Sequence, residues 1–281
     1  MTAVHYEIAG ISFAVSSDFP ISEFSLPRFD PFTVESERID CDIRLHMIDL
    51  RKGALPTEEL FRSDSVRERL AHCAGKSPDV HVQMNENSLL CIDFPEHRLD
   101  IFLTGGLHPR RGYFRIGAFP YSVFLHEYGS VMLHSSCVDC GGRGALFLAP
   151  DEGGKTTAAR LMEGYRVLSD DMVLARKEGN VFRAWGTPWT TFEPSTASLP
   201  VAGLFLLEKA DRFQLEELSF QDVFSHIWEE NGFIAGVMPP EHRKTFFDLC
   251  CDISSSAPGW RLRFPPDHID IGAVTGSLAD P

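Results

Sequence analysis

A glycine-containing loop between an apolar segment and a helical segment constrains the fold of this chain more than any other feature. Residues Ala145–Ala149 are uniformly apolar and predict a short buried strand. The loop Pro150–Gly154 follows, and Lys155–Glu163 predicts a helix that Gly164 ends at its C′ position. A strand, loop and helix in this order form the basic unit of α/β folds, so a sheet with packed helices is expected.

The loop also carries the residue types of a phosphate-binding P-loop, which is written G-x-x-x-x-G-K-[ST]. Backbone N–H groups at the start of a helix point toward a phosphate, and the helix dipole favours its negative charge. In such a loop the lysine reaches the β- and γ-phosphates and the hydroxyl binds Mg²⁺. The sequence therefore predicts nucleotide phosphate binding by the run Gly153, Gly154, Lys155, Thr156 and Thr157.

The match is imperfect at the first glycine and at two variable positions of the loop, where small neutral residues would be safer. Ala149 stands where the first glycine belongs, and Asp151 and Glu152 add negative charge to the loop. Two carboxylates repel a triphosphate unless they point outward or bind a metal. A glycine-rich turn without ligand is the alternative interpretation of the same residues.

Two further elements supply the other groups that phosphoryl transfer needs, namely a metal-binding carboxylate and a base. Asp170 and Asp171 end the next predicted strand, Tyr165–Leu168. His134 lies in the preceding apolar strand, Val131–Val138, where its imidazole could lie beside the aspartates. The alternatives are a plain Asp-Asp turn between two strands and a hydrogen-bonded core histidine.

The order His134, Gly154-Lys155-Thr156, Ser169-Asp170-Asp171 resembles the HPr kinase/phosphorylase superfamily, whose nucleotide site is akin to that of phosphoenolpyruvate carboxykinase. It is most similar to the divergent HPr-kinase-like proteins found in peptide-modification gene clusters. In that family a strand histidine precedes the P-loop and an aspartate pair follows the P-loop helix. The resemblance covers about residues 119–190, and weaker likeness extends to Gly186–Trp189 and Arg261–Phe264.

The resemblance implies ATP and Mg²⁺ as cofactors and assigns a role to each matching residue. Lys155 would bind phosphate, Thr156 and Asp171 the metal, and Asp170 would be the general base with His134 supporting it. The Glu-x-Arg-Gly stretch of the bifunctional enzymes is missing, and near Arg183–Gly186 only the glycine matches. Phosphorolysis of a phosphoprotein is therefore not expected.

The rest of the chain predicts a small domain before the kinase-like domain. Residues 1–118 indicate an antiparallel α+β domain that could recognise the acceptor, and residues 119–281 the α/β P-loop domain. The strands expected in the first part are Tyr6–Ile8, Ile11–Val15, Asp42–Ile48, Val80–Met84, Ser88–Phe94 and Leu99–Leu103, with a helix at 57–73. The second part adds helices at Pro120–Tyr128, 220–231 and 239–251 and strands at Met172–Ala175 and Trp260–Phe264.

Composition excludes several classes of partner. The formal net charge is −14, from 26 Lys and Arg against 40 Asp and Glu, which disfavours nucleic acid and anionic membrane surfaces. No apolar run approaches the length of a transmembrane helix, and the N-terminus lacks a signal-peptide pattern. Seven irregularly spaced cysteines indicate reduced thiols in the cytoplasm. Cys137-x-x-Cys140 lacks a second ligand pair, so packing in a hairpin is preferred over zinc or redox chemistry.

These observations predict a Mg²⁺-dependent kinase that transfers phosphate from ATP to a hydroxyl of a peptide, protein or small molecule. The alternative is a degenerate nucleotide- or peptide-binding partner in which Asp151 and Glu152 abolish triphosphate binding. A carboxykinase-like enzyme would need a keto-acid site that the sequence does not indicate. The acceptor, the nucleotide and any homo-oligomeric state stay open.

Overall fold

The computed structural model describes residues 2–17, 27–48, 80–85, 88–104 and 118–279. The chain divides into two compact units. Unit 1 comprises Met1–Phe124 with Val237–Pro239, and unit 2 comprises Leu125–Gly236 with Pro240–Pro281. The sequence-based division lay between residues 118 and 119. The helix predicted at 57–73 lies outside the described residues.

Unit 1 contains a six-stranded sheet in the order β1-β2-β3-β6-β5-β4. Every strand predicted in this part of the sequence is present, because alternating or continuous apolar residues mark each of them. The strands are β1 Thr2–Ile8, β2 Ile11–Ser17, β3 Cys41–Ile48, β4 Val80–Asn85, β5 Ser88–Asp93 and β6 Arg98–Thr104. The prediction of an antiparallel sheet was wrong, because β3 runs parallel to both β2 and β6. The side-chain pattern of a strand indicates its buried face but not the direction of its neighbour.

Aromatic side chains fill the core of unit 1. Tyr6, Phe13, Phe29, Phe94 and Phe124 are each at most 2% exposed. The short 3-10 helix η2, Pro27–Phe32, supplies one of these rings, and the ring centroids of its Phe29 and of Tyr6 lie 4.9 Å apart. Several of the 22 phenylalanines of the sequence thus serve core packing in this unit.

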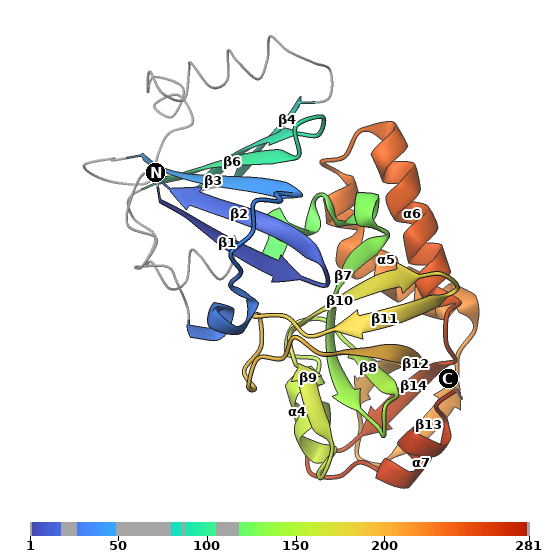
Figure 1. The fold of residues 1–281 in the computed structure, drawn as a ribbon. Helices are drawn as coiled ribbons and strands as arrows, with labels where there is room; N and C mark the ends of the chain where they lie inside the picture. Colours follow the sequence, from blue (N-terminus) through green and yellow to red (C-terminus); the bar gives the residue numbers. More distant parts are fainter. Residues whose placement is uncertain (1, 18–26, 49–79, 86–87, 105–117, 280–281) are drawn as a thin grey trace. The chain divides into compact units, whose positions relative to one another are not determined.

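Unit 2 is built on an eight-stranded mixed sheet (Figure 1). Its main path runs β11-β10-β7-β8-β12-β14-β13, and β9 pairs with β7. The strands are β7 Ser130–Asp139, β8 Gly144–Leu148, β9 Arg166–Ser169, β10 Met172–Glu178, β11 Val181–Trp185, β12 Ser198–Lys209, β13 Gln214–Glu217 and β14 Gly259–Phe264. The central strand β12 is parallel to β8 and to β14. The phosphate-loop candidate therefore leaves the carboxyl end of a buried parallel strand, where α/β folds place their ligands.

Two groups of helices pack against this sheet. The helices are α4 Lys155–Leu161, α5 Phe220–Ala235, α6 Pro240–Ser254 and α7 Ile271–Gly276. Helices α4 and α7 share one apolar cluster with β8, β12 and β14. Helices α5 and α6 lie side by side and both contact β7 (Figure 1). The protein is thus a mixed α/β structure, as predicted.

The helix predicted over Pro120–Tyr128 is present in two pieces. Residues 118–122 are helical, and the 3-10 helix η3 covers Leu125–Tyr128. Gly129 follows with a φ of 64°, the left-handed conformation that ends a helix. Among the described residues, no helix has the length and apolarity needed to cross a membrane.

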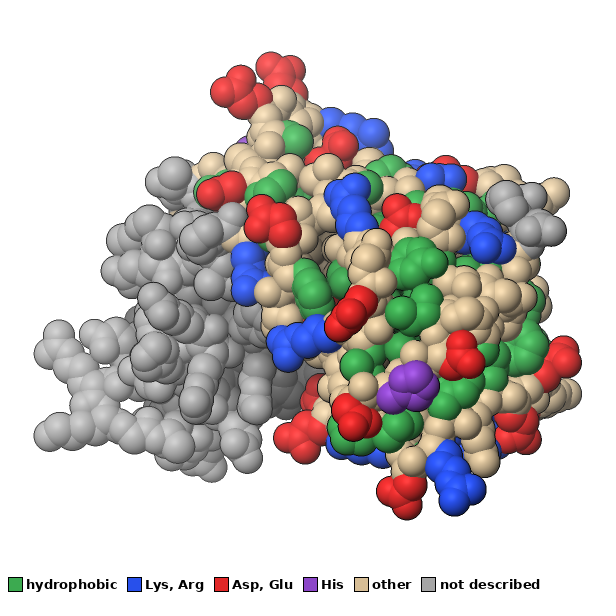
Figure 2. Space-filling view, turned by 90° about the horizontal axis from the view of Figure 1, so that it is seen from below, with side chains coloured by type: hydrophobic (Ala, Val, Ile, Leu, Met, Phe, Trp, Pro, Cys, Tyr) green, Lys and Arg blue, Asp and Glu red, His purple; other side chains and the backbone are tan. Residues whose placement is uncertain are grey.

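The described residues on one face of the molecule carry mixed charges. On the face that Figure 2 shows, Lys and Arg side chains stand apart among acidic and hydrophobic ones. The described residues of that face therefore do not form the clustered positive surface that a nucleic-acid backbone requires.

Candidate functional site

The loop between β8 and α4 has a backbone that requires both of its glycines. A Cβ atom on Gly153 would lie 2.5 Å from Ala149 Cβ and 2.9 Å from the Pro150 carbonyl oxygen. Gly154 has a φ of 105°, which L-residues with side chains rarely adopt, and it is the N-cap of α4. Because glycine has no capping side chain, the first N–H groups of the helix have no side-chain acceptor at their own N-cap.

Lys155 is buried against this loop. Lys155 is 6% exposed, and its Nζ donates to the carbonyl oxygens of Ala149 at 2.9 Å and Pro150 at 3.0 Å. Burial lowers the pKa of Lys155, although the surrounding carboxylates, Asp171 first among them, act in the opposite direction. The ammonium group therefore stays inside the loop and bonded to the carbonyl oxygens of its own backbone.

Asp170 is the most extensively hydrogen-bonded carboxylate of the site and is 1% exposed. Its Oδ2 accepts from Thr156 Oγ1 at 2.8 Å and from Thr191 Oγ1 at 2.6 Å. Its Oδ1 accepts from Thr190 Oγ1 at 2.9 Å and from the Thr191 backbone N–H at 2.6 Å. Burial by itself would raise the pKa of Asp170, but these donors outweigh it and lower the pKa.

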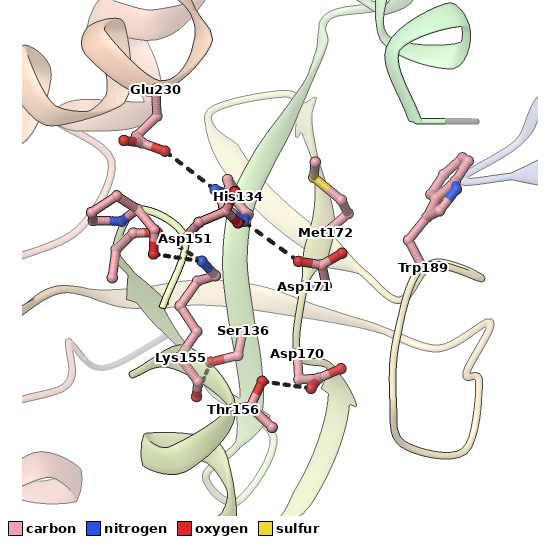
Figure 3. A network of polar contacts seen from close by, with 12 residues as sticks. His134, Ser136, Asp151, Lys155, Thr156, Asp170, Asp171, Met172, Trp189 and Glu230 are labelled. Atoms are coloured by element: carbon pink, nitrogen blue, oxygen red, sulfur yellow. Dashed lines mark hydrogen bonds and ion pairs between the residues drawn. The ribbon is translucent and has the colours of Figure 1, made fainter. Parts of the chain in front are cut away.

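His134 lies among three other carboxylates. Its Nδ1 is 3.2 Å from Glu230 Oε2, and its Nε2 is 3.4 Å from Asp171 Oδ1 and 3.3 Å from Asp151 Oδ1. Figure 3 shows the imidazole between Glu230, which comes from α5, and Asp171. The structure thus brings His134 to Asp171, the second aspartate of the pair.

The charge of His134 follows from these neighbours. The hydrogen bond to Asp171 is the largest influence and raises the pKa of His134, and Glu230 adds to it. Burial and the positive charge of Lys155 act against the shift and do not cancel it. The imidazole is therefore held toward its protonated form, in which both nitrogens donate.

The aspartate pair reaches the loop because a strand ladder is interrupted. Strands β9 and β10 both pair with β7, at Cys137↔Ser169 and at His134↔Met172. The two pairs are three residues apart on β7 and also three residues apart from β9 to β10, so the pairing register is the same before and after the gap. A regular strand would turn Asp170 and Asp171 to opposite faces. Asp170 and Asp171 lie in the gap between the two ladders, outside any regular strand. There Asp170 contacts Thr156 and Asp171 contacts His134 (Figure 3).

The acidic side chains of the loop are exposed to solvent, and Asp151 also reaches the His134 imidazole. The Asp151 side chain is 94% exposed, and Glu152 is exposed with a φ of 60°. Thr157 lies in the first turn of α4 and is partly exposed. Ala149 is fully buried, and its methyl group is part of the core cluster.

Four residues of the site were missed by reasoning from sequence. Thr190 and Thr191 bind Asp170, Glu230 binds His134, and His226 lies one helical turn before Glu230 on α5. Burial lowers the pKa of His226 and outweighs the opposing charges of Glu230 and Glu229, and Lys155 adds to the lowering. The spacing of His226 and Glu230 places them on one face of a helix, a signal that could have been used. The two threonines follow Gly186–Trp189 and have no comparable local signal.

The cysteine pair is part of the core. Cys137 and Cys140 are free, buried thiols beside the turn between β7 and β8. Burial raises the pKa of Cys140 to about 11 and raises that of Cys137 further. Neutral thiols in such a place act as small apolar side chains.

Comparison with protein-family models and with curated proteins finds no match to this chain.

Proposed function

We propose that unit 2 binds a nucleoside triphosphate with Mg²⁺ and transfers its terminal phosphoryl group to a hydroxyl of a peptide, protein or small molecule. The observation that carries this proposal is the meeting of two pairs, Thr156 with Asp170 and His134 with Asp171, at the start of the helix that Lys155 begins. The resemblance to HPr-kinase-like proteins supports the same conclusion.

The donor set is suited to magnesium and a polyphosphate. Mg²⁺ prefers hard oxygen ligands and is commonly held by one or two carboxylates together with substrate phosphates. Four carboxylates, Asp151, Asp170, Asp171 and Glu230, face two cationic groups, Lys155 and His134. This negative surplus disfavours a bare triphosphate, and a divalent cation would relieve it. Bound Mg²⁺ and ATP would supply the transferred group and neutralise its charge.

Within the proposal, the two aspartates exchange the roles that the sequence indicated. Asp170 accepts four hydrogen bonds, and its lowered pKa makes it a weak proton acceptor. Its contact with the Thr156 hydroxyl suits the metal side of the site, as the P-loop hydroxyl and an acidic residue share the metal in P-loop enzymes. The Asp171 side chain is 36% exposed and can reach an acceptor, so Asp171 is the proposed base.

Lys155 and His134 would then balance the negative charge of the phosphate and of the carboxylates. Lys155 would exchange its bonds with the Ala149 and Pro150 carbonyls for phosphate oxygens, and the buried position strengthens that interaction. Protonated His134 would hold the Asp171 carboxylate in place and balance Glu230. Unit 1 and its sheet are the proposed source of acceptor recognition.

A second candidate function rests on the same lysine. Its ammonium is already satisfied by two loop carbonyls, and Asp151 adds negative charge near the loop. A protein that keeps this arrangement would be a non-catalytic binding partner without triphosphate affinity.

Nucleotide titration separates the two functions. With ATP and Mg²⁺ at 100 times the dissociation constant, the wild-type protein should gain about 2.7 kcal/mol of unfolding free energy, a rise of roughly 5–10 °C in melting temperature. Lys155→Ala should remove this gain and reduce transfer by at least about a hundredfold. Lys177→Ala, which breaks a surface pair with Asp252, is the matched control and should behave as wild type.

Two outcomes contradict the proposal. A wild-type protein that is not stabilised by ATP, GTP or another nucleotide with Mg²⁺ would favour the binding-partner function. A folded Lys155→Ala variant that keeps full transfer activity would remove the loop from the site. Labelled ATP followed by mass spectrometry of the labelled product would identify the acceptor.

A further inference from the structure

Two histidines and a glutamate of unit 2 bring metal-ligating atoms together on elements that the proposed kinase site does not use. His126 and Glu127 come from η3, and His242 comes from the first turn of α6. His126 Nε2 lies 2.9 Å from His242 Nδ1, and Glu127 Oε1 lies 3.5 Å from the same His242 nitrogen. The three ligand atoms all lie within 4.8 Å of one another.

The chemistry of this group differs from that of the nucleotide site. Two imidazole nitrogens with one carboxylate oxygen form the His₂Glu set that binds Zn²⁺, with water in the fourth position. Imidazole suits zinc and similar transition metals, whereas Mg²⁺ selects oxygen ligands. We propose that His126, Glu127 and His242 form a binding site for Zn²⁺ or a similar transition-metal cation.

The geometry fits this cation with a small adjustment. At the usual Zn–N distance of about 2.0–2.1 Å, two nitrogens of a tetrahedral site lie about 3.3 Å apart. The observed 2.9 Å therefore needs the rings to part by a few tenths of an ångström. The rings meet edge to face, at an interplanar angle of 85°, so they can part without disrupting a stack.

Burial of the ligands suits a site that solvent reaches from one side. His126 is 2% exposed, and the side chains of His242 and Glu127 are 22% and 25% exposed. The buried imidazole provides a rigid first ligand, and the two partly exposed ligands leave room for a water molecule and for entry of the ion.

The position of the ligands gives the ion a structural role. The chain passes into unit 2 at Leu125 and again at Pro240, and the ligands lie within three residues of these two points. A bound cation would join η3 to the start of α6 and hold both segments against β7, which each of them contacts. We therefore expect the ion to stabilise unit 2 without taking part in phosphoryl transfer.

The test is zinc binding by the full chain without a histidine tag, after treatment with a chelator and without nucleotide. Isothermal titration with Zn²⁺ should show one equivalent bound. His242→Ala should weaken binding by at least about a hundredfold, because it removes a direct ligand and even the loss of a supporting group costs about 10–100-fold. Glu127→Gln should weaken binding by at least about tenfold, because the amide keeps an oxygen donor but loses the negative charge. His268→Ala, at an exposed position of the same unit, is the matched control and should bind as wild type.

Cobalt substitution distinguishes this site from the cysteines. Co²⁺ bound by His₂Glu should give visible absorption without a thiolate charge-transfer band. Burial raises the pKa of Cys140 to about 11 and that of Cys250 to about 12, so these thiols resist deprotonation. Circular dichroism of each variant confirms folding. Less than one equivalent of Zn²⁺ in the wild type, equal affinity in His242→Ala, or a thiolate band with Co²⁺ would each overturn the proposal.

Discussion

The two units place buried charge in different ways. In unit 1 the paired side chains come from one strand or from neighbouring strands of one sheet. His46 Nε2 lies 2.8 Å from Asp100 Oδ1, and Arg98 contacts both Asp100 and Asp93. A second pair, Arg44 with Asp42, lies beside them on β3. Positive and negative groups are thus matched within the sheet.

In unit 2 the charged groups come from a loop, a strand, a ladder interruption and a helix, and negative charge is in surplus. Asp151, Asp171 and Glu230 all lie within 3.4 Å of one imidazole. Charges on adjacent strands that cancel one another stabilise a sheet. Charges brought together from separate elements with a surplus of one sign mark a place suited to a ligand of the other sign.

The largest expected effect comes from removing the charge of one carboxylate of the negative surplus in unit 2. Asp171→Asn should lower the rate constant of transfer by about 10²–10⁴-fold, because the proposed base for the hydroxyl proton is removed. The partly exposed side chain tolerates the amide, so stabilisation by nucleotide should persist. Single-turnover kinetics with labelled ATP measures the rate constant.

Two further variants complete that experiment. Asp252→Asn breaks a surface pair with Lys177 and should leave the rate constant unchanged. Asp170→Asn should instead reduce Mg²⁺-dependent nucleotide binding. If Asp170→Asn affects only the rate constant and Asp171→Asn affects nucleotide binding, the roles first indicated by the sequence are the right ones.

The next effect tests the matched charges of unit 1. Asp100→Asn should lower the unfolding free energy of the β3–β6 region by about 3–5 kcal/mol, because a buried ion pair loses one partner. Hydrogen exchange of the amides in β3 and β6 should accelerate accordingly. Nucleotide binding should stay within about twofold of wild type, and a loss as large as that of Lys155→Ala would contradict the contrast between the units.

The smallest effect concerns the imidazole. Glu230→Gln should lower the pKa of His134, because one of the carboxylates that raise it is lost. The raised pKa stabilises the fold fully below the ordinary value of 6.5, and this stabilisation disappears as the pH rises through the folded-state pKa. Glu230→Gln should therefore reduce stability most just below pH 6.5, and its effect should fade as the pH rises through the folded-state pKa of His134.

Titration of the His134 ring by NMR measures this change. The rate of transfer should fall by no more than about tenfold, because Asp171 also acts on the ring. An unchanged or raised pKa of His134 in the variant would show that Glu230 does not act on the imidazole.

Local patterns were enough to predict many of the elements. The strands β1 to β6, the hairpin β7–β8, and helices α4, α5 and α6 follow from apolar periodicity and from glycines at turns. Strand β12 was missed although it is central, since Pro200 and Gly203 within it resemble strand breakers. A Cβ atom at Gly203 would lie 2.7 Å from the Leu278 side chain, so a larger residue there would force that side chain to shift.

The sequence by itself determined the loop that precedes α4. Gly153 and Gly154 are needed for steric reasons that act within a few residues, so neighbours in the chain suffice to predict this turn. The parallel pairing of β3, the separate environments of Asp170 and Asp171, and the contacts of Glu230 and Thr191 were decided only by the tertiary structure. These contacts join residues 21 to 96 positions apart, and the register and packing that bring such residues together depend on the whole fold.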